Sequence, residues 1–322
     1  CTAVHFYGSK GSSYLGRNLD WSCGYGESVH IMPAGFPLSH PFLADDEASH
    51  SVIGMSVNLN NYPLFFDCGN DAGLAIAGLN HPGCASYADT PQADKTNLAA
   101  YEFPLWVAAN FATVDEAEKA LEDALIVNKP VADSFPVSYL HWIIGDSKRS
   151  IVVESRDDGL HVMDNPVDVL ANHPDFEWHL TNLRTYITAS PESPKPATWG
   201  SAELSPFGAG AGMRGIPGDV YSPSRFVKAA YLNAFYPTQE SERDNVIRCF
   251  RSLDGVAMIK GSAIMPSGGM EYTLYASCFS SETKGYYFST YDDPTIGFAS
   301  LYEAKGADPT MLIACEPKAW IA

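Results

Sequence analysis

Runs of apolar residues interrupted by polar turns in the first quarter of the chain predict β-strands. Segments 3–8 (AVHFYG) and 12–20 (SSYLGRNLD) flank the polar stretch SKGS and predict a hairpin. Three further strands are expected at 51–59, 63–70 and 73–80, which are rich in β-branched and aromatic residues. Asn-Asn-Tyr-Pro and Asn-Asp-Ala-Gly, which are turn-forming sequences, separate these three segments.

The apolar spacing changes to a helical one after Tyr101. An apolar run at 103–111 (FPLWVAANF) predicts a first helix, and the amphipathic segment 113–125 predicts a second. Thr113 and Glu116 stand three residues apart before that segment, which is the pattern of a capping box. The second helix is therefore expected to begin at this point.

The rest of the chain predicts strands, helices and strands again. Ser222 is expected to cap one of these helices, with Pro223 at its first position. The expected strands are 140–146, 150–157, 159–164, 270–281 and 285–293, and the expected helices are 176–187, 222–237 and 243–253. This order fits an α+β fold with antiparallel sheets covered by helices in layers, and not βαβ units. No internal repeat or linker is present, so one domain over residues 1–322 is expected.

Composition and charge exclude several kinds of partner. Of 322 residues 46% are hydrophobic and 18% charged, which is typical of a folded chain. The net charge of −18 argues against nucleic acid and anionic membranes, since both require clustered Lys and Arg. No apolar run approaches the roughly 18 residues of a membrane span. An anionic ligand would therefore have to meet a local positive group.

The cysteines and histidines indicate reduced thiols and no metal. Seven scattered cysteines without a CxxC pair are typical of a cytoplasmic protein and not of a disulfide framework. The nine histidines include no HExxH motif, so no metal ion is expected. The GAGMRG segment at 210–215 follows no strand and opens no helix, so no dinucleotide cofactor is expected either.

Cys1 is the first candidate for chemistry. A free terminal amine titrates near ~8 and a thiol near ~8.5, so an N-terminal cysteine carries a nucleophile together with its own base. The ordinary alternative is a chain that starts on cysteine by accident.

The motif GRNLDW, shortly after the first turn, supplies two charged candidates. Arg17 would favour a thiolate or hold an anion, and Asp20 would orient the ammonium group. Positions 17 and 20 point to opposite faces of a regular strand, so this interpretation requires a bulge at Asn18–Leu19. An exposed Arg–Asp pair is the alternative.

Asn80, Asn172 and Arg225 complete the set of candidate catalytic residues. Asn80 ends an apolar strand and could present amide donors to an oxyanion, as could Asn172. A polar turn and a helix cap are the respective alternatives. Arg225 lies in the first turn of an expected helix, where the helix dipole disfavours a positive charge, so it is expected to act elsewhere.

In order and spacing, these segments resemble the choloylglycine hydrolase family of N-terminal-nucleophile hydrolases, and within it the bile salt hydrolases. The segments that carry the resemblance over essentially the whole chain are Cys1, GRNLDW, DCGNDAGLAIAGLNHPG, NHPDFEWHLTNLRTY and GIPGDVYSPSRFVKAAY. It implies a four-layer αββα sandwich and a homotetramer. The implied activity is hydrolysis of glycine- or taurine-conjugated bile salts through an acyl-enzyme, without a cofactor.

The resemblance also implies roles for these residues. Cys1, uncovered by removal of the initiator Met, would be the nucleophile and its amine the base, flanked by Arg17 and Asp20. Asn80 and Asn172 would form the oxyanion hole, and Arg225 would support the site electrostatically. By analogy with the family's steroid pocket, the expected substrate-binding residues are Trp21, Tyr25, Leu59, Phe65 and Phe135, with core packing as the alternative for each.

Two other functions remain open at this point. One is the hydrolysis of penicillin V or another N-acyl compound, although family members that prefer penicillin V tend to carry Tyr where this chain has Asn80. The other is a non-catalytic protein that binds bile acids.

Overall fold

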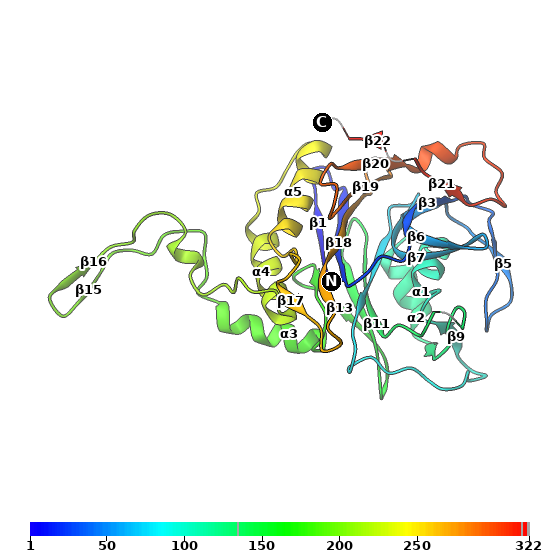
Figure 1. Ribbon diagram of the computed structural model, residues 1–322, viewed down its shortest axis with the longest axis horizontal. Coiled ribbons are helices and arrows are strands. Elements are labelled where there is room, and N and C mark those ends of the chain that lie inside the picture. Colours follow the sequence, from blue (N-terminus) through cyan, green and yellow to red (C-terminus); the bar gives the residue numbers. More distant parts are fainter. Residues whose placement is uncertain (134, 317, 321–322) are drawn as a thin grey trace.

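Two antiparallel sheets stacked face to face form the centre of the molecule (Figure 1). The computed structural model describes residues 1–133, 135–316 and 318–320. Within them the first sheet runs in the order β14 (Val169–Leu170), β1 (Thr2–Tyr7), β2 (Ser13–Trp21), β18 (Met270–Ser280), β19 (Gly285–Thr290), β20 (Gly297–Ser300) and β22 (Lys318–Ala319), and β17 (Ala263–Ile264) pairs with β18.

The second sheet contains most of the strands predicted between residues 51 and 164. Its order is β13 (Gly159–Asp164), β12 (Ser150–Arg156), β11 (Leu140–Gly145), β8 (Ala75–Asn80), β7 (Tyr62–Asn70), β6 (Val52–Leu59), β3 (Ser28–Met32) and β21 (Ile313–Ala314). Three two-stranded ribbons lie outside both sheets, namely β4 (Pro37–Leu38) with β5 (Asp46–Glu47), β9 (Thr96–Ala99) with β10 (Ala124–Val127), and β15 (Ala197–Trp199) with β16 (Ala202–Leu204).

Helices cover the outer faces of the two sheets (Figure 1). α1 (Phe103–Asn110) and α2 (Val114–Leu121) pack on the second sheet, while α4 (Ser222–Phe235) and α5 (Glu242–Asp254) pack on the first, with α3 (Phe176–Leu183) against α4. Single 3₁₀ turns occur at η1 (Arg184–Tyr186), η2 (Ala211–Met213) and η3 (Leu301–Ala304). The expected αββα layering is confirmed.

Local sequence explains where the elements begin and end. α1 is apolar on nearly every side and is buried against the second sheet, as a helix without a polar face must be. Thr113 Oγ1 accepts from Glu116 N at 3.2 Å, so the predicted start of α2 is confirmed. The predicted cap of α4 is wrong by one residue, because Ser222 is already helical and Tyr221 precedes the helix. No helix among the described residues is long and apolar enough to cross a membrane.

Candidate active site

The amino terminus of Cys1 is held by two side chains beneath a cavity. β1 pairs with β2 so that Thr2 faces Asn18, which brings Asp20 beside the start of the chain. The Cys1 amine lies 2.9 Å from Asp20 Oδ2 and donates to Asn172 Oδ1 at 2.6 Å. The Cys1 thiol lies 3.8 Å from the carbonyl oxygen of Asp20. Both the thiol and the amine of one residue therefore face the same small space.

Asn172 links three parts of the chain. It follows β14 and precedes α3, and its Oδ1 accepts both from the Cys1 amine and from Arg225 Nη2, at 2.7 Å. Its Nδ2 donates to the backbone carbonyl of Asn80 at 2.6 Å. One of the two Nδ2 hydrogens is thus used to join the end of β8 to the amino terminus.

Arg225, which lies in the first turn of α4, donates hydrogen bonds to acceptors at the start of β1. Its Nη1 donates to the Cys1 carbonyl and, at 2.6 Å, to Thr2 Oγ1, and it lies 3.6 Å from Asp20 Oδ2. The side chain is 4% exposed. Burial lowers the pKa of its guanidinium, while Asp20 opposes that shift. The unfavourable position in the helix is explained by these contacts with the first strand.

Burial sets the protonation state of the Cys1 amine. Desolvation lowers its pKa from 8.0 to about 5, although the Asp20 carboxylate acts in the opposite direction. Burial acts to raise the pKa of Asp20, but the terminal ammonium group and Arg225 outweigh it, so the net shift is downward. At neutral pH the amine is therefore mostly unprotonated and able to accept a proton.

Arg17 is directed away from Cys1, toward the second sheet. Its Nη1 lies 3.5 Å from Asp67 Oδ1 in β7, and among the described residues none of its hydrogen bonds reaches Cys1. Arg17 borders the cavity, but its Nε and Nη2, which have no hydrogen-bond partner among the described residues, are buried. The guanidinium therefore contacts the second sheet and does not present these two donors to a ligand in the cavity.

The bulge expected at Asn18–Leu19 is in the neighbouring strand. The pairing of β2 with β18 shifts between Thr273 and Tyr275, while β2 itself runs without interruption. Thr273 Oγ1 donates to Asp20 Oδ1 at 2.6 Å. The shift thus fixes the Asp20 carboxylate toward the amine, so the expected bulge position is wrong.

A cavity of about 910 Å³ opens above Cys1. Of the predicted substrate-binding residues, Trp21, Tyr25, Phe65 and Phe135 line it. Leu59 does not, because it pairs with Tyr62 at the turn between β6 and β7, at the far end of that hairpin. Its placement in the substrate site is a correction to the sequence analysis.

Sequence reasoning missed several lining residues that come from loops. They are mostly apolar and include Pro130, Val131, Pro136, Val137, Met258 and Met265. Loops carry no periodic signal, so no pattern in the chain could have identified these residues. Lys129, an exposed cation, also lies in this lining.

Comparison with known proteins places these features in a family. The family model for linear amide C–N hydrolases of the choloylglycine hydrolase family matches residues 1–309. The chain is 50% identical over 297 residues to a bile salt hydrolase/transferase of Bifidobacterium longum subsp. longum, covering 92% of this chain and 93% of that protein. It is 46% identical over 294 residues to a conjugated bile acid hydrolase of Lactobacillus acidophilus, covering 91% and 93%.

A solved structure agrees with these sequence relatives. A variant of the conjugated bile acid hydrolase from Clostridium perfringens superposes with a TM-score of 0.90 at 31% identity, covering all of this chain and 97% of that one. The similarity therefore extends over the whole fold, including the segments that surround Cys1.

Proposed function

Because the chain belongs to the choloylglycine hydrolase family of linear amide C–N hydrolases, we propose that it cleaves the amide of glycine- or taurine-conjugated bile salts. The products are the free bile acid and the amino acid. The observation that carries this proposal is a terminal cysteine whose unprotonated amine and thiol meet beneath an apolar cavity. The names of the relatives supply the class of substrate.

The first step is transfer of the acyl group to Cys1. The amine accepts the thiol proton, and Sγ attacks the amide carbon to give a tetrahedral oxyanion. When the C–N bond breaks, the leaving amine takes the proton from the Cys1 ammonium group and departs as glycine or taurine. A water molecule, deprotonated by the same amine, then hydrolyses the thioester and releases the bile acid.

Asn172 and Asn80 supply the donors for the oxyanion. One Nδ2 hydrogen of Asn172 is bound to the Asn80 carbonyl, and the other remains available to a ligand. The pairing of β8 with β7 ends at Ala77, so Asn80 lies beyond that ladder and lines the cavity. Removing one such donor typically reduces kcat by about 10²–10³.

The cavity fits an amphipathic anion with a bulky apolar body. Trp21, Phe65 and Phe135 offer apolar surface for a steroid. Lys129, an exposed cation in the lining, offers positive charge in a protein of net charge −18. Its ammonium group is a candidate for holding the carboxylate or sulfonate of the conjugated amino acid.

Parallel assays test the choice of substrate. Purified, reduced protein is given glycocholate, taurocholate and penicillin V, and product release is measured for each. Release of glycine or taurine at a much higher rate than penicillin V cleavage supports the proposal. Cleavage of penicillin V alone would overturn it in favour of an acylase, and saturable bile acid binding without hydrolysis would indicate a binding protein.

A homotetramer is also proposed, on the basis of the projecting arm formed by residues 187–220. The ribbon β15–β16 extends away from the body of the molecule (Figure 1). Ile187, Trp199 and Phe207 in this arm are 82%, 76% and 112% exposed. Large apolar side chains at such exposure mark an interaction surface, and the family resemblance indicates a second copy of the chain as its partner.

The cytoplasm is the proposed location. All seven cysteines are free thiols in the structure. Reduced, scattered cysteines are typical of proteins from a reducing compartment.

A further inference from the structure

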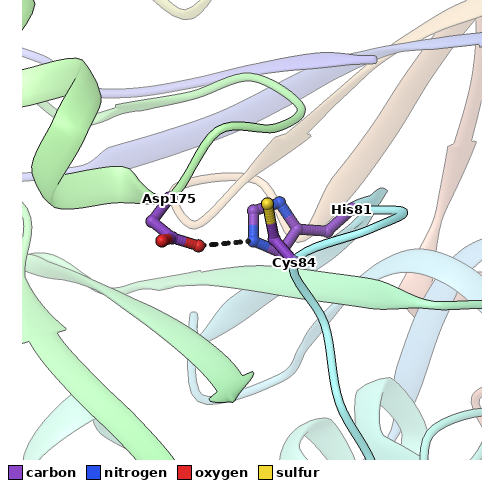
Figure 2. Close-up of side chains that lie close together, drawn as sticks. All are labelled: His81, Cys84 and Asp175. Carbon is purple, nitrogen blue, oxygen red and sulfur yellow. Dashed lines mark ion pairs between the residues drawn. The ribbon is translucent and has the colours of Figure 1, made fainter. Parts of the chain in front are cut away.

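A second group of reactive side chains lies beside Asn80. His81 directly follows β8, Cys84 lies in the next turn, and Asp175 immediately precedes α3. Figure 2 shows the three side chains directed toward one another. Their ligand atoms all lie within 4.8 Å of one another, and His81 Nε2 is 3.4 Å from Asp175 Oδ1.

His81 is the unusual member of this group. Its side chain is completely buried, yet neither ring nitrogen makes a hydrogen bond to any described residue. A buried polar atom without a partner calls for an explanation, and a bound ion is one of the few available.

The distances fit a tetrahedral metal ion. Zinc bonds of about 2.0–2.2 Å to nitrogen and oxygen place two tetrahedral ligand atoms about 3.4 Å apart. His81 Nε2 and Asp175 Oδ1 have this separation. A histidine, a thiolate and a carboxylate are all zinc ligands, and three protein ligands leave the fourth position to water.

Glu154 lies close to the group but has other partners. Its Oε1 is 3.7 Å from His81 Nε2. However, its two oxygens accept from His141 at 3.0 Å, from Arg156 at 2.7 Å and from the backbone N–H of Phe176 at 3.0 Å. The glutamate therefore adds negative charge beside the ion without serving as a ligand.

We propose that His81 Nε2, Cys84 Sγ and the Asp175 carboxylate bind one Zn²⁺ ion. On binding, the Cys84 thiol loses its proton to solvent and its sulfur bonds to the metal. Asp175 has a side chain that is 44% exposed, which gives the ion a route from solvent to the buried imidazole. The sequence predicted no metal because the ligands are divided between residues 81–84 and the distant residue 175.

The proposed metal site lies between the two chain segments that carry Asn80 and Asn172. His81 and Cys84 continue from Asn80, while Asp175 lies three residues after Asn172. The side chain of Asn172 and the carbonyl of Asn80 are already joined at 2.6 Å. A bound ion would add a second link between the same two segments and so stabilise the proposed oxyanion hole.

Zinc binding is measured in the Cys1→Ala protein, which removes the N-terminal thiol as a competing ligand. Equilibrium dialysis against Zn²⁺ should give one ion per chain. Cys84→Ser and Asp175→Asn, each in the same background, should weaken binding by at least about tenfold. Cys23→Ser, which removes an exposed thiol elsewhere, should leave the affinity unchanged.

Cobalt identifies the sulfur ligand directly. Co²⁺ in place of Zn²⁺ should produce a thiolate-to-metal charge-transfer band that is lost in Cys84→Ser and retained in Cys23→Ser. Asp175→Asn alters a partly exposed side chain, and its circular dichroism spectrum shows whether the fold is intact. Absence of zinc binding, or affinity and cobalt spectra that do not change in Cys84→Ser, would overturn the proposal. Because the Cys1→Ala protein carries no nucleophile, this result is independent of the proposed hydrolysis.

Discussion

At Cys1 a single residue supplies two functional groups, and its surroundings assign a task to each. Asp20 and Asn172 bind the amine, which leaves the thiol toward the cavity. Sequence alone predicted Cys1 from its thiol and free amine, Asp20 from the GRNLDW motif on the next strand, and Arg225 from its unfavourable place in the first turn of a helix. It could not reveal that Arg17 pairs with Asp67, since that contact joins two sheets across 50 residues of chain.

Replacement of the nucleophile tests the residue-scale account. Cys1→Ala should reduce turnover of taurocholate to background and leave the fold intact, because the acyl group has no acceptor. Cys1→Ser should retain almost no activity, since an alcohol is a much weaker nucleophile at neutral pH. Release of taurine at the wild-type rate by either variant would contradict the assignment. Circular dichroism verifies folding, and Cys23→Ser is the matched thiol control.

The lowered pKa of the terminal amine predicts the acid side of the pH profile. Above about pH 5 the amine is unprotonated and accepts the thiol proton, whereas below it kcat/KM should fall by about tenfold per pH unit. Taurocholate is the substrate of choice because its sulfonate stays ionised throughout. A midpoint near pH 8 would show that burial does not depress this pKa.

Asp20→Asn refines the same measurement. The carboxylate raises the pKa of the amine, so its neutralisation should move the acid limb to lower pH and reduce the maximum rate. Asp158→Asn, which changes an exposed carboxylate bound to the half-buried His161, should shift nothing. An acid limb that remains in place in Asp20→Asn would exclude this coupling.

At the scale of elements, strands β1, β2 and β18 position the groups proposed to be catalytic. Two strand-like segments on either side of a polar turn made β1 and β2 predictable from sequence, and the continuous apolar run made α1 predictable. The register shift in β18 could not be predicted, because it depends on which strand pairs with β2, about 250 residues away. The loop that contributes residues 129–131 and 135–139 to the cavity has no periodic pattern from which its place could have been predicted.

Substitution of Gly16 by alanine tests how closely α5 packs on β2. A Cβ at this position would lie 2.2 Å from Cys249 Sγ and 2.6 Å from the Ser277 carbonyl, so Gly16→Ala must displace α5 or β18. Overpacking of this kind should lower the free energy of unfolding by about 1–3 kcal/mol, measured in urea. In Gly218→Ala the new Cβ meets no atom within 4 Å, so that variant should match the wild type. Equal stability of Gly16→Ala and Gly218→Ala would show that the packing is looser than the structure indicates.

At the scale of the whole molecule, four layers enclose two apolar clusters, and one arm leaves the body. The layered class followed from the order of the predicted elements, since strands and helices occur in separate runs. The arm at 187–220 was not predicted. Its short ribbon β15–β16 is exposed along its length, so it lacks the apolar alternation that identifies a strand packed on a core.

The exposed aromatic residues of the arm predict the state of assembly. Trp199→Ser combined with Phe207→Ser should convert a tetramer into smaller species in sedimentation velocity, because both side chains are fully available to a partner. Met311→Ser, an exposed apolar residue outside the arm, is the control. A tetramer that persists in the double variant, or a wild-type monomer, would contradict the proposed role of the arm.

A removable leader ahead of Cys1 separates the contribution of the proposed catalytic amine from that of the thiol. A protein with a cleavable leader ahead of Cys1 has the same thiol, but its nitrogen is a peptide amide and cannot accept a proton. Taurine release from taurocholate is measured before and after a protease exposes Cys1. No turnover is expected before cleavage and full turnover after it, because only the exposed amine can accept the thiol proton. Equal turnover in both states would show that the thiol acts without its amine.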